Sequence, residues 1–286
     1  MPWFSTDNPW QVDESPFLLA HLYKVSPVLT RDYGTIASFT STSTSLQCNT
    51  RDHLALGFGV GGGIPFLASA SVKGHYDKDV QQNTDSNKAS IRASIRSGFV
   101  ELATQPRLTD KAITVIKFGG GIPSLEARYG DYYVAGYRLG GDTAMLMSSS
   151  SYNTKEKEVF GVTVSVEVLF FESSTHWEKD FNLFASGTSL KLQGYDTLSA
   201  QNWNESSSGD SGATLFERSK VIANNTQNLG ERLSAILDRM KLQSGAELTM
   251  EQCDNLTRSG IVVELVLMPI RTTRHVLEWA VQDNII

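Results

Sequence analysis

A glycine-rich segment and a Gly-Asp-Ser-Gly tetrad are the places where residue types and spacing could support chemistry. Gly57, Gly59 and Gly62 satisfy the Gly-x-Gly-x-x-Gly pattern that seats a pyrophosphate when it links a strand to a helix. Here Ile64 and Pro65 follow, and the run after them favours an extended chain. Because no helix amino terminus is expected at this point, the pattern does not predict a nucleotide site.

The tetrad at residues 209–212 has the form that carries a nucleophilic serine in some proteases. A serine of that kind needs a histidine base, and no histidine here stands in the Ala-His-Cys context of those enzymes. The histidines are also too dispersed to form an i, i+4 metal-binding pair. They are His21, His53, His75, His176 and His275. We therefore expect no catalytic residue, no metal and no cofactor, and we interpret the tetrad as a surface loop.

Composition and charge exclude further classes. The 286 residues include 31 acidic and 25 basic side chains, a net charge of −6 without a run of either sign, which argues against nucleic-acid binding. No window approaches about 18 consecutive apolar residues, and the amino terminus lacks a secretory signal pattern. This predicts a chain that is cytoplasmic as synthesised and reaches a membrane, if at all, by a non-classical route. Cys48 and Cys253 are expected to be buried thiols.

The first 45 residues are expected to form a strap followed by a strand. Prolines interrupt an aromatic-rich beginning that includes Trp3, Phe4 and Trp10. These aromatic side chains either dock on the body of the protein or contact lipid headgroups, since Trp favours the water–lipid boundary. Residues 35–48 are rich in Thr and Ser with interspersed apolar residues, which predicts a strand.

Two long amphipathic hairpins are expected in the central region, residues 55–200. In the first, the arms are residues 64–72 and 89–102, joined by a polar loop at 74–88. The second arm alternates, with Ile91 and Ile95 on one face and Arg92 and Arg96 on the other. If this arm crossed a membrane, the arginines would have to face a water-filled lumen and the apolar face would meet lipid.

The second expected hairpin has arms at residues 132–147 and 159–171, joined by a polar loop at 148–158. Its second arm alternates through four valines. They are Val162, Val164, Val166 and Val168. The segments 61–67 and 119–125 share the letters GGGIP, and we expect both to provide bends that launch long strands.

The last part of the chain, residues 213–286, is expected to hold helices and a final strand. A short strand near 189–193 and a polar loop at 201–212 precede it. Apolar spacing predicts a helix over 215–242 with a break at Gly230, and Thr249 with Gln252 predicts the capped start of another. Residues 261–270 read as a buried strand. We predict a single α+β domain over 1–286, in which a bent, twisted, mainly antiparallel sheet is flanked by helices.

A short motif extends this prediction. Tyr129, Gly130 and Tyr133, followed after six residues by Gly140 and Gly141, resemble the signature of the membrane-attack-complex/perforin (MACPF/CDC) superfamily. The family pattern is Tyr-Gly-Thr-His-aromatic, six residues, Gly-Gly, so that Asp131 and Tyr132 stand in place of Thr and His. The order of elements over residues 55–270 is similar to the bent four-stranded sheet of that family, and its fungal members are the nearest comparison.

The resemblance implies a function. Members of the family bind membrane lipid as soluble monomers, assemble into arcs or rings, and convert two helical inserts into transmembrane β-hairpins. For this chain it implies a homo-oligomeric, membrane-associated pore former, with a second protein component as a further partner. The expected loops at 74–88 and 148–158 are shorter than the inserts of the family. Gly140 and Gly141 would lie where the sheet straightens, so Gly140→Val or Gly141→Val should block insertion more than folding.

Other classes remain open at this point. A non-lytic protein on the same scaffold could recognise a partner or a glycan through its loops, and a gasdermin-like pore former would share the hairpin pattern. An enzyme of unrecognised type would need a concave pocket that holds a histidine or carboxylate pair.

Overall fold

The computed structural model describes most of the chain, in seven stretches. These are residues 2–3, 14–18, 27–44, 67–85, 87–150, 190–206 and 212–282. Helices and strands alternate irregularly along them. The strands are β1 (Pro2–Trp3), β2 (Pro27–Thr44), β3 (Asn87–Leu102), β4 (Tyr132–Ser149), β5 (Leu190–Asp196), β6 (Gln201–Ser206) and β7 (Val262–Pro269). The helices are α2 (Ala68–Gln82), α3 (Asp110–Phe118), α4 (Gly121–Tyr129), α8 (Gly212–Gln227), α9 (Leu229–Arg239), α10 (Met250–Arg258), the 3-10 turn η2 (Ile270–Thr272) and α11 (Arg274–Gln282).

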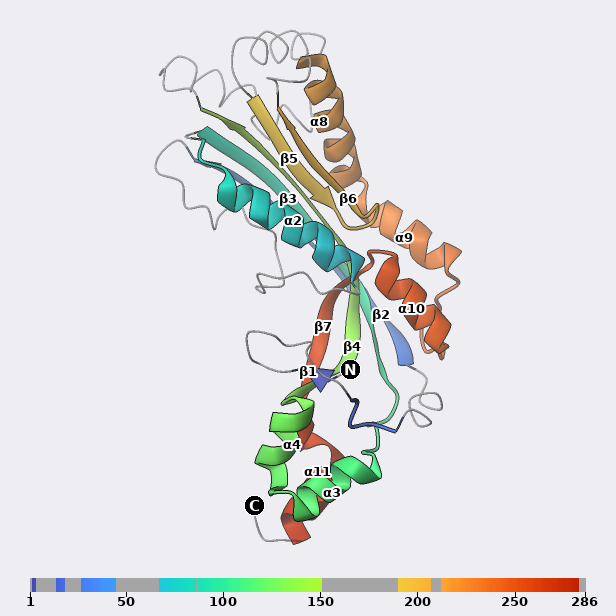
Figure 1. The fold of residues 1–286 in the computed structure, drawn as a ribbon. Coiled ribbons are helices and arrows are strands. Elements are labelled where there is room, and N and C mark those ends of the chain that lie inside the picture. The colour runs from blue at the N-terminus through green and yellow to red at the C-terminus, as the bar shows by residue number, and fades with distance from the viewer. Residues whose placement is uncertain are drawn as a thin grey trace.

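One long, twisted sheet organises these elements (Figure 1). Five of its seven strands follow the order β2-β3-β4-β5-β6, and β1 and β7 pair with β4 beside that path. The strand pairs are antiparallel. The first half of β4 pairs with β7 as far as Leu139, which lies opposite Val262, and the second half pairs with β5 from Thr143 onward. The α+β class and the mainly antiparallel sheet with flanking helices are thereby confirmed.

Two helical layers cover the upper part of the sheet. Successive strand residues point to opposite faces, so neighbours in β4 identify which helix lies on which side. Ala144 and Leu146 pack with α2, whereas Met145 and Met147 pack with α8. The sheet is therefore enclosed between α2 on one face and α8 on the other, which Figure 1 shows near the top of the molecule.

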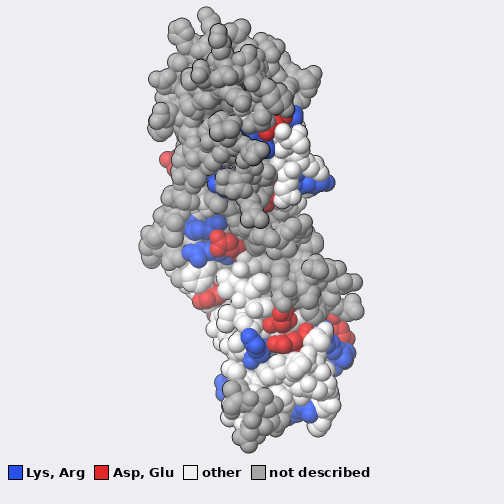
Figure 2. Space-filling model, turned by 90° about the vertical axis from the view of Figure 1, so that its left-hand side faces the viewer, with Lys and Arg blue, Asp and Glu red and all other residues white. Residues whose placement is uncertain are grey.

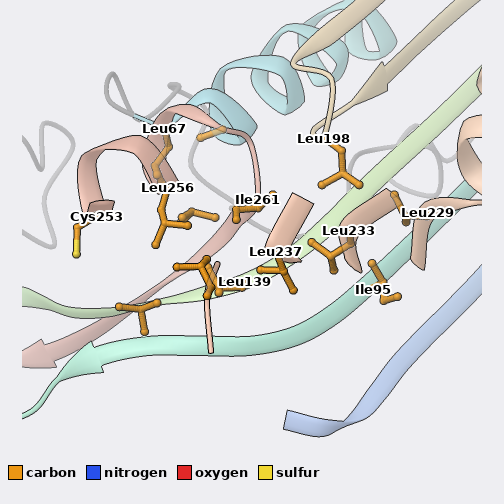
Figure 3. Packing of buried hydrophobic residues seen from close by; sticks show 14 of the residues in the cluster. Leu67, Ile95, Leu139, Leu198, Leu229, Leu233, Leu237, Cys253, Leu256 and Ile261 are labelled. Atoms are coloured by element: carbon orange, nitrogen blue, oxygen red, sulfur yellow. The ribbon is translucent and has the colours of Figure 1, made fainter. Parts of the chain in front are cut away.

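A central apolar cluster joins α9 and α10 to the sheet below that level. Leu229, Leu233 and Leu237 of α9 extend toward Ile95 of β3 and Leu139 of β4 (Figure 3). Leu256 and Cys253 come from α10, which begins with the predicted capping box: the Thr249 hydroxyl accepts from the Gln252 amide at 3.2 Å. These contacts fix the α9–α10 pair against the middle of the sheet.

The lower end of the molecule is a compact group of α3, α4 and α11 around the start of β4 (Figure 1). Phe17 packs edge-on against Tyr133, with ring centroids 5.2 Å apart, and both side chains are buried. The glycines of the second GGGIP segment join α3 to α4, and Gly120 and Gly121 have φ values of 108° and 77°. Glycine is required there because the backbone turns through a left-handed conformation, and the segment does not launch a strand as predicted.

The first predicted hairpin was assigned wrongly. Residues 68–72 and most of the expected polar loop belong to the helix α2, and the hairpin partner of β3 is β2 rather than residues 64–72. The buried side of α2 does carry an apolar series at helical spacing, Val72, Tyr76 and Val80, but Ser69 and Lys73 interrupt the buried face and the polar residues between them resemble a loop. Much of the second expected hairpin, residues 159–171, lies outside the described residues.

Two smaller predictions were also wrong. Residues 201–206 form the strand β6 instead of a loop; its Asn and Gln residues suit an edge position, where alternate groups face water. The break between α8 and α9 falls at Asn228, two residues before Gly230. Val262 and Val263 of β7 are buried, but its second half is partly exposed.

Candidate functional site

The sheet bends at Gly140 and Gly141, where β4 exchanges β7 for β5 as its neighbour. Register shifts interrupt the ladder on the same level, between Arg96 and Gly98 in the pairing of β3 with β4. A matching shift lies in β2, between Arg31 and Ile36. In Figure 1 the strands change direction partway along their length, and Gly140 adjoins the register shift between β3 and β4. The role of the two glycines as a hinge stays a prediction.

The space around the two glycines differs. A Cβ atom on Gly140 would collide with the backbone oxygen of Ile95, which cannot move aside. A Cβ atom on Gly141 would meet the side-chain ends of Leu198 and Leu229 at 3.0–3.1 Å. Gly140→Val should therefore impair folding itself, contrary to the expectation that either valine would act mainly on insertion. A small side chain is accommodated more easily at Gly141, because the neighbouring leucine side chains can move.

Asp142, the residue after the two glycines, is the centre of a buried ionic cluster that we name the bend network. The bend network consists of Lys73, Ser94, Arg96, Asp142 and Glu264. Lys73 of α2 donates to Oδ2 of Asp142, and the Ser94 hydroxyl donates to Oδ1 at 2.8 Å. Arg96 donates to both oxygens of Asp142 and, through Nε, to Glu264 on β7 at 2.7 Å.

Burial governs the electrostatics of this cluster. Asp142 is fully buried, and the Lys73 side chain is 4% exposed. Burial lowers the pKa of the Lys73 ammonium, and the charge of Asp142 opposes that shift. For Arg96 burial also acts to lower the pKa, but Asp142 and Glu264 together raise it above its ordinary value. The network therefore joins α2, β3, β4 and β7 through charges that depend on one another.

A second buried carboxylate lies on the opposite face of the sheet, one strand away. Asp196 of β5, which pairs with Thr143, is fully buried. Its carboxylate accepts from Arg232 of α9 at 2.6 Å. Asn225 of α8 donates to the same oxygen at 3.0 Å. Asp142 thus binds α2 on one face, and Asp196 binds the α8–α9 pair on the other.

The end of α2 is held by a further polar group. Asp85 accepts from Lys191 of β5 at 3.0 Å and from the Ser148 hydroxyl at 2.7 Å. Asn83 donates to Ser148 at 2.7 Å and to Gln193 at 3.1 Å. Polar and charged contacts therefore attach both the middle and the end of α2 to the sheet.

The remaining signature residues lie at the lower end of β4. Tyr129 closes α4 and is buried, and its hydroxyl finds no hydrogen-bond partner among the described residues. Gly130 follows with a φ of 90°, a value that favours glycine, and its amide donates to Glu126 at 2.9 Å. Tyr133 is buried, which raises its pKa. The motif thus spans the junction of the lower end with the sheet.

The predicted hairpin-arm residues of β3 alternate between the two faces of the sheet, and helices cover both faces. Ile91 packs under α8 and Ile95 under α9, while Arg96 enters the bend network. Arg92 is half-buried on the same face as Arg96. The four predicted valines, Val162, Val164, Val166 and Val168, lie outside the described residues.

The predicted lipid-contacting aromatics are placed only in part. Trp3 belongs to β1, whose backbone pairs with Tyr132 of β4. Phe4 and Trp10 lie outside the described residues, as does Cys48. Cys253 is a buried free thiol, and burial raises its pKa to about 11.

In the described part of the chain, no three His, Cys, Asp or Glu side chains gather closely enough to hold a metal ion. A surface hollow of about 420 Å³ lies between α9 and α10, and Met240, Asn255 and Arg258 contribute to its lining. The lining holds no histidine or carboxylate pair, and the hollow is separate from the bend network. Within the same residues, no helix is long and apolar enough to cross a membrane.

Charges of both signs adjoin on the side of the molecule shown in Figure 2. Arg128 and Lys111 at the lower end lie beside Glu14, for example, with Lys111 Nζ 3.0 Å from a Glu14 oxygen. Such exposed pairs contribute little to stability. The bend network differs from these exposed pairs because its central carboxylate, Asp142, is fully buried.

Sequence reasoning found Arg96, Gly140 and Gly141 at this site but missed Lys73, Asp142 and Asp196. Asp142 gave one usable signal: a carboxylate directly after a glycine pair, in a strand whose next residues are apolar. Lys73 gave none, because its segment was predicted as the end of a strand and the start of a loop. The partners come from elements far apart in sequence, which no local pattern reveals.

Comparisons with known proteins give structural likenesses and no sequence relatives. No family model matches the sequence. No curated protein matches it either. Solved structures similar to this chain include pneumolysin. It is 10% identical to this chain, with 88% of this chain and 44% of pneumolysin covered and a TM-score of 0.32.

Two further likenesses are bacterial. A putative cell invasion protein with a MAC/perforin domain from Bacteroides thetaiotaomicron is 12% identical, with 81% of this chain and 56% of that chain covered and a TM-score of 0.29. GNIP1Aa from Chromobacterium piscinae is 15% identical, with 77% and 48% covered and a TM-score of 0.26. The chain thus spans 44–56% of the length of these three proteins. Likenesses with TM-scores this low support no conclusion about the activity of this chain.

Proposed function

We propose that this chain is a perforin-like protein that assembles on a membrane and extends two β-hairpins into it. The single observation that carries this proposal is the arrangement of four strand ends. Lys88 lies opposite Thr44, Asn87 opposite Ser149, and Ser149 opposite Leu190. The ends of β2 and β4 and the beginnings of β3 and β5 therefore form one row at the upper edge of the sheet.

Both long connections leave from that row. Residues 45–86 join β2 to β3, and residues 150–189 join β4 to β5. If each connection became a hairpin in the existing register, each arm would have about twenty residues, whereas a strand needs about nine to eleven to cross a bilayer. This differs from the prediction of short loops, which would have forced core strands to redeploy. The helix α2 lies within the first connection, so this part of the chain is stored as a helix.

The family resemblance of the Tyr129–Gly141 segment, the bend at Gly140 and Gly141 and the position of α2 all support the same proposal. Membrane lipid is the partner, and a homo-oligomer in the form of a ring or arc is the active state. An enzymatic role is not part of the proposal.

Dye release from lipid vesicles, combined with negative-stain imaging, tests this proposal. We expect release of an encapsulated dye together with ring- or arc-shaped assemblies on the same vesicles. Membrane binding with neither release nor assemblies would overturn pore formation and favour a non-lytic recognition protein. Release without assemblies would instead indicate nonspecific disruption of the bilayer.

A reversible crosslink between α2 and β6 tests whether dye release requires α2 to leave the sheet or results from nonspecific disruption of the bilayer. Ser71 is exposed on α2, and the Asn202 side chain of β6 donates to the carbonyl of the neighbouring Val72 at 2.7 Å. In a background with Cys48→Ser and Cys253→Ser, Ser71→Cys and Asn202→Cys can be joined by a short reducible crosslinker. We expect the joined protein to release no dye until the bridge is reduced. The single Ser71→Cys variant, treated identically, is the control.

A further inference from the structure

The lower end of the molecule carries large apolar side chains that remain exposed. Phe118, the last residue of α3, is 85% exposed, more than any other large apolar side chain in the described part of the chain. Leu277 and Val281 of α11 are 43% and 64% exposed. Single apolar residues scattered over a surface are ordinary, but a contiguous group of them marks an interaction site. We name these three residues the tip patch.

The tip patch is contiguous because the turn between α3 and α4 adjoins α11. A Cβ atom on Gly121 would lie 3.4 Å from the ring of Trp279, so the turn that follows Phe118 contacts α11. Figure 1 shows α3, α4 and α11 together at the bottom of the molecule. Gly119 and Gly120, the next residues of the turn, have no side chains with which to shield the Phe118 ring.

Helical spacing gives α11 two apolar stripes. Val276 and Ala280, four residues apart, are buried against the rest of the lower end. Leu277 and Val281, also four residues apart, form a second stripe that faces outward. An apolar stripe on the outer side of a surface helix is the kind of surface against which another helix packs. The partner that fits the tip patch is therefore a helix.

The charges beside the outer stripe identify α11 of a second copy as that helix. Arg274 and Glu278 are both exposed, and Arg274 Nε lies 2.7 Å from a Glu278 oxygen. When two α11 helices pack antiparallel about a two-fold axis near Val276, Arg274 of each copy lies opposite Glu278 of the other. The same arrangement brings the two Leu277 side chains together at the axis and opposes the two helix dipoles. A surface with this pattern is complementary to itself, as an isologous interface requires.

The position of the tip patch argues against lipid as its occupant. The lower end lies at the other end of the sheet from the row of strand ends that Asn87 and Ser149 mark (Figure 1). Under the proposed function that row faces the membrane, so the tip patch points away from it. Pairing through the tip patch leaves the row of strand ends free on both copies.

We infer that the tip patch is a self-association surface, through which two copies of this chain form a two-fold dimer in solution. The contact consists of two antiparallel α11 helices, with Phe118 beside them. The choice of protein over lipid rests on the proposed function. The dimer itself does not require pore formation, and it is separate from a ring or arc on a membrane.

Sedimentation equilibrium of the full chain without lipid tests the dimer. Over a dilution series we expect twice the mass of one 31.4 kDa chain at high concentration, falling toward one chain on dilution. Leu277→Lys puts like charges at the axis and should raise the dissociation constant at least tenfold. Val221→Lys is the matched control, because Val221 is 45% exposed on α8 and lies far from the lower end. Circular dichroism verifies that both variants are folded.

The control should dimerise like the parent protein. A single-chain mass for the parent at the highest concentration would overturn the inference. So would a Leu277→Lys dimer as stable as that of the parent, because association would then use another surface.

Charge reversal tests the antiparallel arrangement. In Arg274→Glu, and equally in Glu278→Arg, like charges face each other across the axis, and each variant alone should dimerise at least tenfold more weakly. Mixed in equal amounts, the two variants should form a heterodimer, since two glutamates then oppose two arginines. The double variant should dimerise like the parent. A mixture that associates no better than its components would contradict the pairing of Arg274 with Glu278.

The other occupants are distinguished by flotation with phosphatidylcholine vesicles. If the parent protein sediments as a single chain and floats with vesicles, loss of flotation in Phe118→Ser would assign the tip patch to lipid. Unchanged flotation in Phe118→Ser would assign it to another protein, and either result overturns the inference. Dye release is measured separately on the parent protein. A dimer that releases no dye and forms no assemblies would overturn the proposed function and leave this inference intact.

Discussion

The lower end of the molecule and the upper sheet are both well packed, but they are stabilised in different ways. Around α3, α4 and α11 the core is apolar. Its buried members are Phe17, Leu108, Ala112, Ile116, Leu125, Tyr129, Tyr133, Ile270 and Val276. Around α2 a smaller apolar cluster is accompanied by buried contacts between charges and hydroxyls. Burial alone therefore does not identify the fixed part of a fold, because hydration can replace polar contacts and cannot replace apolar ones.

The largest expected effect comes from neutralising the centre of the bend network. Asp142→Asn leaves Lys73 and Arg96 buried without their shared counter-charge, and we expect a loss of about 3–5 kcal/mol in the free energy of unfolding. Denaturant unfolding followed by circular dichroism measures it. Adding Lys73→Met to Asp142→Asn removes one stranded charge, so the double variant should be more stable than the sum of the single effects. Strict additivity would show that the charges do not interact.

Leu125→Ala tests the apolar lower end. Leu125 is fully buried in α4, and the cavity left by its truncation should lower the free energy of unfolding by about 2–5 kcal/mol. The same denaturation experiment measures this, and hydrogen exchange of α2 should be unchanged. Faster exchange in α2 would mean that the two regions open together, contrary to the comparison drawn above.

Lys73→Met should weaken only the attachment of α2 to the sheet. Asp142 keeps Arg96 and Ser94 as partners, so the effect should be about 1–3 kcal/mol and local to α2. We expect amide hydrogen exchange in α2 to accelerate about tenfold or more, with α8 unaffected. Lys220→Met is the matched control, because the Lys220–Glu217 pair on α8 is exposed. Equal acceleration in α2 and α8 would contradict selective detachment.

Tyr129→Phe should have the smallest effect. Among the residues that the structure describes, the buried Tyr129 hydroxyl has no hydrogen-bond partner, so its removal leaves no group unsatisfied. The free energy of unfolding should change by less than about 1 kcal/mol, toward greater stability. Thermal unfolding monitors this variant. Clear destabilisation would reveal a polar contact of Tyr129 and would make the lower end less purely apolar than its core suggests.

Much of the sheet could be predicted from the sequence because β3, β4 and β5 carry local signals. In β3, isoleucine and arginine alternate with period two, and the two faces are indeed different. The capping box at Thr249 is equally local, since both of its partners lie within one turn. Such elements need no knowledge of the rest of the chain.

The helix α2 could not be predicted in the same way. Its buried side mixes apolar residues such as Val72 and Val80 with Ser69 and Lys73, because the sheet face that it covers is itself mixed. The usual rule, in which an apolar stripe marks the buried side of a helix, presumes an apolar partner. Asp142 was missed for a related reason: the polar partners that make its burial tolerable are non-local in sequence.

The row of strand ends at the top of the sheet also determines how any new strands must be aligned. Asn87 and Ser149 pair the two inner strands at that edge, so chain added beyond β3 and β4 inherits their register. A slip of one residue would invert the faces of everything beyond it. If the two connections extend into hairpins as proposed, the existing sheet register already specifies which of their side chains share a face.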